Sequence, residues 1–343
     1  MFRSTLVRLR RRHWIIWAFG VSLAFSVLGA TESLGQRSGI SSEGRAIIDN
    51  MSGEARREFR SMSRRDRRAF IEDLLKKRSK DTVKKDTTPA QNFEKLEGFV
   101  PPGEISSEIR TMVGKSRRGE RDKAVEIQKK RGAIETGLKA KFIGGADCPE
   151  IDSEQWAIDY SYKRPWPALH KGVDIPQPRG TPIRAVAEGT VIGKFENQGN
   201  RKGIEIMLRH TPAETGLPFW IYSQYTHLRE MSPLPLGAKV TVGQEIGKTS
   251  NTGKMGRRIR RDALHFSIVY SVRPEWSNNG KVIIPKASYW MDPNAFYRAS
   301  PPYDSQSLAK LPDDQKNVPT PYMKPDGSLV PPQTKRIWPY PCE

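Results

Sequence analysis

Hydrophobic and polar residues alternate along much of the second half of the chain. The clearest segments are TPIRAVAEGTVIGKF, GIEIMLRH, FWIYSQYTHL, KVTVGQEIG and ALHFSIVYSV, which begin at Thr181, Gly203, Phe219, Lys239 and Ala263. Glycine, proline and asparagine separate these segments. Short alternating segments bounded by turn residues are typical of antiparallel β-sheets. The pattern predicts a mainly β domain, an open or barrel-like antiparallel sheet, over residues 146–300.

Residues 36–145 have helical spacing instead. The apolar residues that recur every three or four positions are Ile47, Met51, Ala55, Phe59 and Met62. Ser63 and Asp66 have the spacing of a helix capping box. A polar stretch over 79–92 indicates a linker, and a second helix is expected from about residue 120 to residue 142. We expect a basic α-helical region that serves as a solvated spacer, or alternatively as an arm that binds an anionic envelope surface.

The first 35 residues have the layout of a secretory signal peptide. A basic cluster, Arg8 to His13, precedes an apolar run without charge from Trp14 to Ala30, and small residues follow at Ser33 and Gly35. The alternative is an uncleaved anchor helix. The apolar run is at the short limit of the length that a helix needs to cross a bilayer. Either way the remainder is exported, to the periplasm or the cell surface.

The C-terminal segment 301–343 is rich in proline, which predicts an extended tail that wraps a surface or remains mobile. The chain has two cysteines, Cys148 and Cys342. An oxidising compartment permits one disulfide between them, and two unpaired thiols are the alternative.

Charge changes the picture of the partners. The formal net charge is +20, with 28% charged and 36% hydrophobic residues. Such a charge favours polyanions, namely nucleic acid, an anionic membrane surface or a cell-wall polymer. Export argues against nucleic acid, so we expect an envelope partner. No pattern in the sequence predicts an oligomeric state.

Chemistry-bearing residues gather in the β domain, which holds four of the five histidines. His170 and Asp174 are four residues apart, a spacing that returns side chains of an extended segment to one face. His265 on a late strand offers a third ligand, and a catalytic zinc needs three protein ligands and an open position. His227 at a strand end offers a general base or an oxyanion donor. His210 is expected to make a structural hydrogen bond.

Five ordered motifs resemble the lysostaphin-type (LytM-like) zinc endopeptidases. They are HKGVDIPQPRGTPIRAVAEGTVI, YTHL, VTVGQEIGKTSNTG, LHFSI and MDPNAFY, which together cover about 130 residues. The resemblance implies that His170, Asp174 and His265 bind Zn²⁺ and that His227 is one of two catalytic histidines. The family's second histidine lies two residues before the last ligand, where this chain has Ala263.

The resemblance also implies a function. We expect an exported zinc metalloendopeptidase that cleaves peptide cross-links of peptidoglycan. The alternative is a cell-wall binding or regulatory protein that keeps the fold and the metal site but is catalytically weakened or inactive, because alanine at position 263 cannot move a proton.

Overall fold

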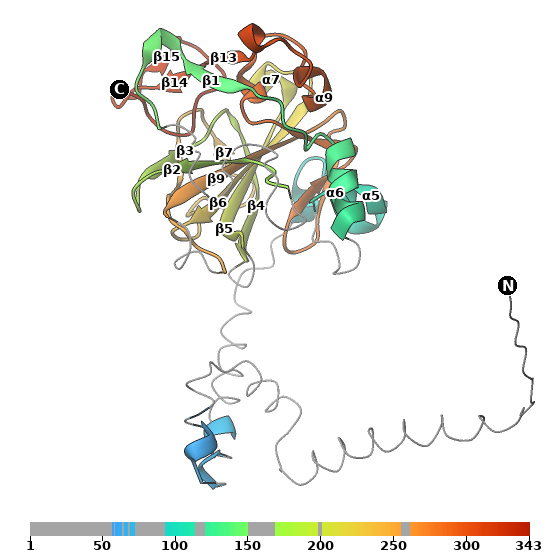
Figure 1. The fold of residues 1–343 in the computed structure, drawn as a ribbon, viewed down its shortest axis with the longest axis vertical. Helices are drawn as coiled ribbons and strands as arrows, with labels where there is room; N and C mark the ends of the chain where they lie inside the picture. The colour runs from blue at the N-terminus through green and yellow to red at the C-terminus, as the bar shows by residue number, and fades with distance from the viewer. Residues whose placement is uncertain are drawn as a thin grey trace, which may run out of the picture. The chain divides into compact units, whose positions relative to one another are not determined.

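The computed structural model describes residues 57, 59–63, 65–67, 69–72, 93–113, 121–149, 169–197, 201–254 and 261–343 (Figure 1). The chain divides into two compact units, Met1–Ala90 and Gln91–Glu343. The predicted export signal (residues 1–35) and the predicted linker (residues 79–92) lie outside the described residues. Among the described residues, no helix has the length and apolar character needed to cross a membrane.

The described residues of the first unit are helical at 59–61, 65–67 and 69–72. The Asp66 backbone N–H donates to Ser63 Oγ at 3.2 Å, which caps the helix that follows. Phe59 and Ile71 are buried, and the rings of Phe59 and Phe70 lie 5.9 Å apart. The helix start predicted at Ser63 is confirmed, whereas Ile47, Met51 and Ala55 of the predicted helical spacing lie outside the described residues.

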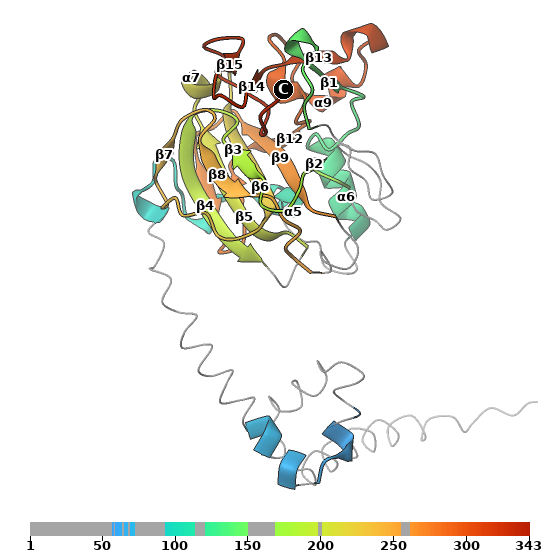
Figure 2. The same cartoon turned by 90° about the vertical axis from the view of Figure 1, so that its left-hand side faces the viewer.

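One antiparallel sheet forms the body of the second unit. Its strands lie in the order β12-β9-β6-β5-β4-β7, and β2 also pairs with β9 (Figure 2). The strands are β2 (Val173–Pro176), β4 (Gly189–Asn197), β5 (Gly203–His210), β6 (Trp220–Leu228), β7 (Lys239–Val240), β9 (Ala263–Ser271) and β12 (Ser288–Met291). The predicted mainly β, antiparallel fold is confirmed.

Short elements surround this sheet. The two-stranded pairs are β1 (Lys139–Phe142) with β13 (Asn317–Thr320), β3 (Pro182–Arg184) with β8 (Glu245–Lys248), β10 (Trp276–Asn278) with β11 (Ile283–Pro285), and β14 (Tyr322–Met323) with β15 (Leu329–Val330). The α-helices are α5 (Ser107–Val113), α6 (Arg121–Lys130), α7 (Pro212–Thr215) and α9 (Ser305–Leu308). Single 3-10 turns lie at Phe93–Lys95, Pro102–Glu104, Ile143–Gly145, Ala295–Tyr297 and Asp313–Gln315.

The second predicted helix is shorter than expected, since α6 ends at Lys130 rather than near residue 142. Gly132 has a φ of 95°, and a Cβ there would lie 2.3 Å from the Trp290 carbonyl oxygen. The Trp290 N–H donates to the Arg131 carbonyl at 2.7 Å. The backbone leaves the helix to pair with the edge of β12, which an α-helix cannot do. Residues 131–142 therefore pack against the predicted β domain, residues 146–300, which is called the β unit below.

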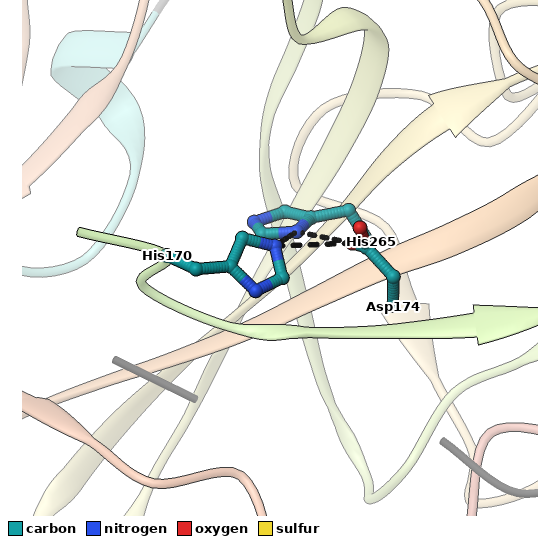
Figure 3. Close-up of side chains that lie close together, drawn as sticks. All are labelled: His170, Asp174 and His265. Carbon is teal, nitrogen blue, oxygen red and sulfur yellow. Dashed lines mark hydrogen bonds and ion pairs between the residues drawn. The ribbon is translucent and has the colours of Figure 1, made fainter. Parts of the chain in front are cut away.

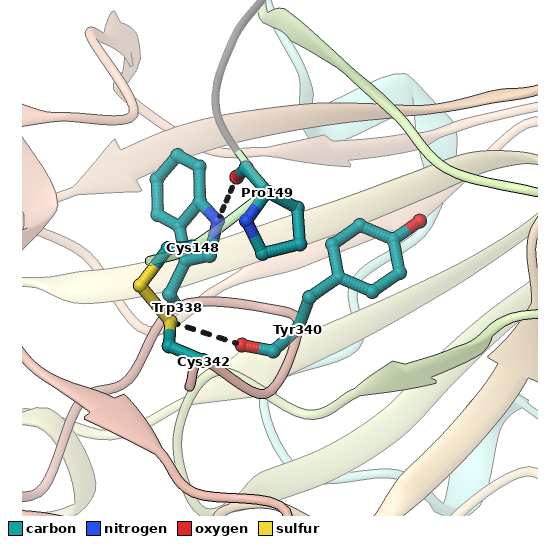
Figure 4. Close-up of a disulfide and its surroundings, with 5 residues drawn as sticks. All are labelled: Cys148, Pro149, Trp338, Tyr340 and Cys342. Atoms are coloured by element: carbon teal, nitrogen blue, oxygen red, sulfur yellow. Dashed lines mark hydrogen bonds between the residues drawn. A yellow bond between two sulfur atoms is a disulfide. The ribbon is translucent and has the colours of Figure 1, made fainter. Parts of the chain in front are cut away.

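The proline-rich tail packs against the sheet rather than remaining mobile. Trp338 and Tyr340 are fully buried in the main hydrophobic cluster, and Trp338 Nε1 donates to the Pro149 carbonyl at 2.7 Å (Figure 4). A disulfide joins Cys148 to Cys342, so the predicted pairing is confirmed. In both views the tail strands lie at the same end of this unit as α7 (Figures 1 and 2).

Candidate functional site

Three side chains from two paired strands and the loop before them converge at one point. Asp174 on β2 lies opposite His265 on β9 in the antiparallel register. His265 Nδ1 lies 2.7 Å from Asp174 Oδ1, and His170 Nε2 lies 2.9 Å from His265 Nδ1 and 3.2 Å from Asp174 Oδ1 (Figure 3). One potential ligand atom from each residue lies within 4.8 Å of the others. The structure thus brings together all three residues that the sequence indicated as metal ligands.

Gly172 allows this convergence. A Cβ at residue 172 would lie 2.5 Å from the Phe266 carbonyl oxygen, 2.6 Å from Ser267 Oγ and 2.9 Å from His265 Cε1. These separations are shorter than Cβ contacts in real proteins, so only glycine lets β2 approach β9 this closely. Glycine at position 172 therefore permits the chain before Asp174 to lie against Phe266 and His265 of β9.

The surroundings of the trio stabilise the ionised Asp174 carboxylate and orient the His265 ring. Burial would raise the pKa of the Asp174 carboxyl, but the charge and the hydrogen bonds of the His170 and His265 rings outweigh it and hold that pKa well below its usual range. His265 Nε2 lies 2.9 Å from Ser267 Oγ, two residues further along the same face of β9. With Nε2 donating its proton to Ser267, His265 presents Nδ1 toward Asp174. Such partners orient metal-binding histidines.

His227 lies beside this trio, with its ring centroid 5.9 Å from that of His265. Its backbone has a φ of 68°, in the left-handed region. Ile204 and Glu205 pair with Leu228 and Thr226, so His227 is the extra residue of a β-bulge. Bulges next to active sites re-aim a side chain.

The hydrogen bonds of the His227 ring define its tautomer. Nδ1 lies 2.9 Å from the Lys202 carbonyl oxygen and 3.1 Å from that of Thr252. Carbonyl oxygens only accept, so Nδ1 carries the proton and Nε2 is the basic nitrogen of the neutral ring. A ring held in this way is chemically able to act as a general base or, once protonated, as an oxyanion donor.

Ala263 begins β9 two residues before His265 and lies on the same face of the strand. Ala263 pairs with Pro176 of β2, and its N–H donates to the Ser250 carbonyl at 3.1 Å. A histidine at this position would share the face of His265, but alanine brings no titratable group there.

Two other side chains of this sheet, His210 and Tyr225, are buried and hydrogen-bonded away from the trio. His210 is fully buried, donates from Nδ1 to the Glu188 carbonyl at 2.5 Å and accepts at Nε2 from Ser223 Oγ at 2.7 Å. Burial lowers the pKa of His210 to about 4, so the ring is neutral at pH 7. Tyr225 is fully buried, and its hydroxyl oxygen accepts the Val186 N–H at 3.1 Å. Neither residue belongs to the trio.

Sequence reasoning missed Gly172, Ser267, Lys202 and Thr252. The even offset of Ser267 from His265 on a strand was a usable signal. Gly172 was visible as a small residue between two candidate ligands. The sequence cannot indicate the roles of the Lys202 and Thr252 carbonyl groups, because every residue has a backbone carbonyl group.

Comparison with known proteins gives matches to the β unit. Residues 168–283 match Peptidase family M23. The peptidoglycan DD-endopeptidase ShyA of Vibrio cholerae is 30% identical over 121 residues, which are 35% of this chain and 24% of ShyA. The chain therefore spans about a quarter of the length of that curated relative.

Solved structures similar to this chain include those of LytU and of a lysostaphin catalytic domain. The structure of LytU has 23% identity and a TM-score of 0.31, covering 48% of this chain and 89% of LytU. The catalytic domain of the antimicrobial peptidase lysostaphin from Staphylococcus simulans has 23% identity and a TM-score of 0.27, covering 34% of this chain and 78% of that domain.

Proposed function

We propose that residues 168–283 form a lysostaphin-type (LytM-like) domain of Peptidase family M23. From this premise we propose that the protein is an exported zinc metalloendopeptidase that cleaves peptide cross-links of peptidoglycan. The observation that carries the proposal is the convergence of His170, Asp174 and His265 within 4.8 Å, with His227 beside them.

The donor set fits zinc. Two imidazoles and one carboxylate are the mixed nitrogen and oxygen ligands that catalytic zinc sites use. Neighbouring ligands of a tetrahedral zinc lie about 3.3 Å apart, given metal–ligand distances of roughly 2.0–2.1 Å. The three separations among the donor atoms are 2.7, 2.9 and 3.2 Å. They are shorter than the tetrahedral separation by about 0.1 to 0.6 Å. A small outward movement of the side chains would accommodate the ion.

Each residue then has a definite task. His170, Asp174 and His265 would hold zinc, which when bound acts as a Lewis acid toward a carbonyl and lowers the pKa of water. His227 Nε2 would accept a proton from the attacking water, or donate one to the developing oxyanion. Its Nδ1–H remains on the carbonyl groups of Lys202 and Thr252, so the ring keeps its orientation while Nε2 changes its protonation state.

Peptidoglycan is proposed as the substrate because it unites two independent features. The named relative is a peptidoglycan endopeptidase. Residues 1–35 have the layout of an export signal, which would place the protein where peptidoglycan lies. The net charge of +20 is suited to retention at an anionic envelope surface, and we assign that role to the basic region before the β unit.

One observation favours a second candidate function. Ala263 leaves His227 without the partner histidine that the family pattern predicts at that position. Losing one proton-transfer group typically lowers a rate by about 10²–10⁴-fold. A protein that binds the wall or regulates another hydrolase, while keeping the fold and the metal site, would tolerate this change.

Two measurements on the exported chain test these functions. Zinc content is determined by atomic emission, and release of soluble peptides from purified cell walls is followed by chromatography, for the natural protein and for Asp174→Asn. Asp313→Asn is the matched control, because the Asp313 side chain is 99% exposed. We expect one zinc and peptide release, both lost only in Asp174→Asn. Zinc and wall binding without peptide release would favour the second function, and absence of zinc from the natural protein would refute the metal assignment.

A further inference from the structure

The backbone of His227 has a conformation that is unfavourable for a residue with a side chain. A left-handed φ is uncommon for residues other than glycine, and His227 is the extra residue of the β-bulge opposite β5. The His227 N–H and the ring Nδ1 both bind the Lys202 carbonyl, at 3.1 and 2.9 Å. The orientation of this ring therefore depends on how firmly the Lys202 carbonyl is held.

Two loop segments meet around the ring, and glycine permits their contact. A Cβ on Gly203 would lie 2.3 Å from the Thr252 carbonyl carbon, and Gly203 has a φ of 71°. Thr252 Oγ1 donates to the Leu228 carbonyl at 2.7 Å and accepts the Ile204 N–H at 3.1 Å. The carbonyl groups of Lys202 and Thr252 thus meet at His227 Nδ1, and Thr252 is tied to the end of β6.

Glu205 holds the Lys202 side of this arrangement. Its side chain is fully buried, and one oxygen lies 3.2 Å from Lys202 Nζ. Asn197 Nδ2 donates to the other oxygen at 2.7 Å, and Gln224 Nε2 also donates to the carboxylate. The donors come from β4, from β6 and from the residue before β5, so one carboxylate joins three neighbouring strands where His227 emerges. A buried carboxylate is costly unless such partners surround it.

Packing of the core does not require this network, because an apolar side chain would fill the same space without needing three polar partners. What the carboxylate adds is a fixed point for Lys202. The side chain of Lys202 is held at Glu205 while its carbonyl accepts from His227, so both ends of one residue are tied.

We propose that Glu205 is a positioning residue: through Lys202 it fixes the carbonyl that binds His227 Nδ1–H and thereby keeps Nε2 as the basic nitrogen beside the metal-ligand trio. This inference rests on the proposed function only for its effect on turnover. The tautomer of His227 is a property of the folded protein, whether or not the protein hydrolyses peptides.

The test combines NMR with kinetics on the zinc-loaded, exported chain. Two-bond ¹⁵N–¹H correlation spectra of labelled histidines report which ring nitrogen of His227 carries the proton, with His227→Gln identifying its signal. We expect the Nδ1–H tautomer in the natural protein and a mixture of both tautomers in Glu205→Gln. We also expect kcat for a wall-derived peptide to fall about tenfold or more with KM unchanged, because small misplacements of a catalytic group have effects of this size.

Matched variants separate positioning from general damage. Glu196→Gln removes the same charge from an exposed position on β4 and should leave the tautomer and kcat unchanged. Lys202→Met should reproduce the effect of Glu205→Gln, and Lys202→Arg should preserve the natural tautomer. Lys202 is 34% exposed, so these two variants fold even where Glu205→Gln does not. A pure Nδ1–H tautomer in folded Lys202→Met would overturn the proposal. If no variant, including the natural protein, releases peptides, the NMR result still decides the role of Glu205.

Discussion

Replacing Gly172 by alanine tests whether the close approach of β2 to β9 creates the metal site. The added Cβ would lie 2.5 Å from the Phe266 carbonyl oxygen and 2.6 Å from Ser267 Oγ. Ordinary contact begins at 3.4 Å, so the backbone oxygen would have to retreat by about 0.9 Å. That oxygen belongs to the residue directly after His265, and the strands cannot separate there without moving the ligand.

The expected magnitude follows from two effects. Overpacking of this kind destabilises folded proteins by about 1–3 kcal/mol. Disturbing the partners that orient a ligand lowers metal affinity by about 10- to 100-fold. Both effects follow from the same added methyl group, because it would also crowd Ser267 Oγ, the partner of His265 Nε2.

The assay is a zinc titration in competition with a chelator, together with urea unfolding of the metal-free chain. Gly103→Ala is the control, because no atom lies within 4 Å of a Cβ built there and its φ is not in the left-handed region. We expect Gly103→Ala to match the natural protein in both measurements. Natural zinc affinity and natural stability in Gly172→Ala would refute the reasoning that glycine is required between the ligands.

Two further predictions concern histidine chemistry. Ala263→His should raise peptide release from cell walls, by up to about 10²–10⁴-fold, without changing zinc stoichiometry, since it adds a proton carrier on the face of His265; unchanged release in a folded, zinc-loaded variant would mean that position 263 does not limit turnover. Burial lowers the folded-state pKa of His210 from 6.5 to about 4, so the unfolded chain binds the extra proton between these pH values and stability should fall as pH falls from 6.5 to 4. Urea unfolding of His210→Gln should lack a part of that slope worth on the order of 3 kcal/mol, and an identical slope in both proteins would contradict the assignment.

The β unit was predictable because its strands alternate and its turns are marked by glycine and proline. The trio was predictable only in part: the four-residue offset of His170 and Asp174 places them on one face, but the pairing of Asp174 with His265 joins residues 91 positions apart. Resemblance to a known family supplied that long-range contact. No local pattern contains it, because register depends on the whole sheet.

The N-terminal and C-terminal flanks of the β unit show where local patterns fail. Lysine-rich spacing after residue 120 favoured a helix to residue 142, yet tertiary pairing with β12 ends it at Lys130. Gly132, with its positive φ, was the available signal. In the tail, proline indicated extended chain, and the apolar residues Ile337, Trp338 and Tyr340, all fully buried, indicated that this chain would pack.

The site itself depends on backbone groups that no residue type reveals. The carbonyl oxygens of Lys202 and Thr252 can only accept hydrogen bonds, so they keep the proton on His227 Nδ1. Nε2 is then the ring nitrogen that can gain and lose a proton. A base at Nε2 can take a proton from water and return it from the same atom to the leaving amine. Under the proposed function, alanine at position 263 would leave the site without a second proton carrier but would not interrupt this cycle. Turnover should then depend on how strictly the His227 tautomer is maintained, and a buried carboxylate that anchors Lys202 is the arrangement expected where one histidine performs both transfers.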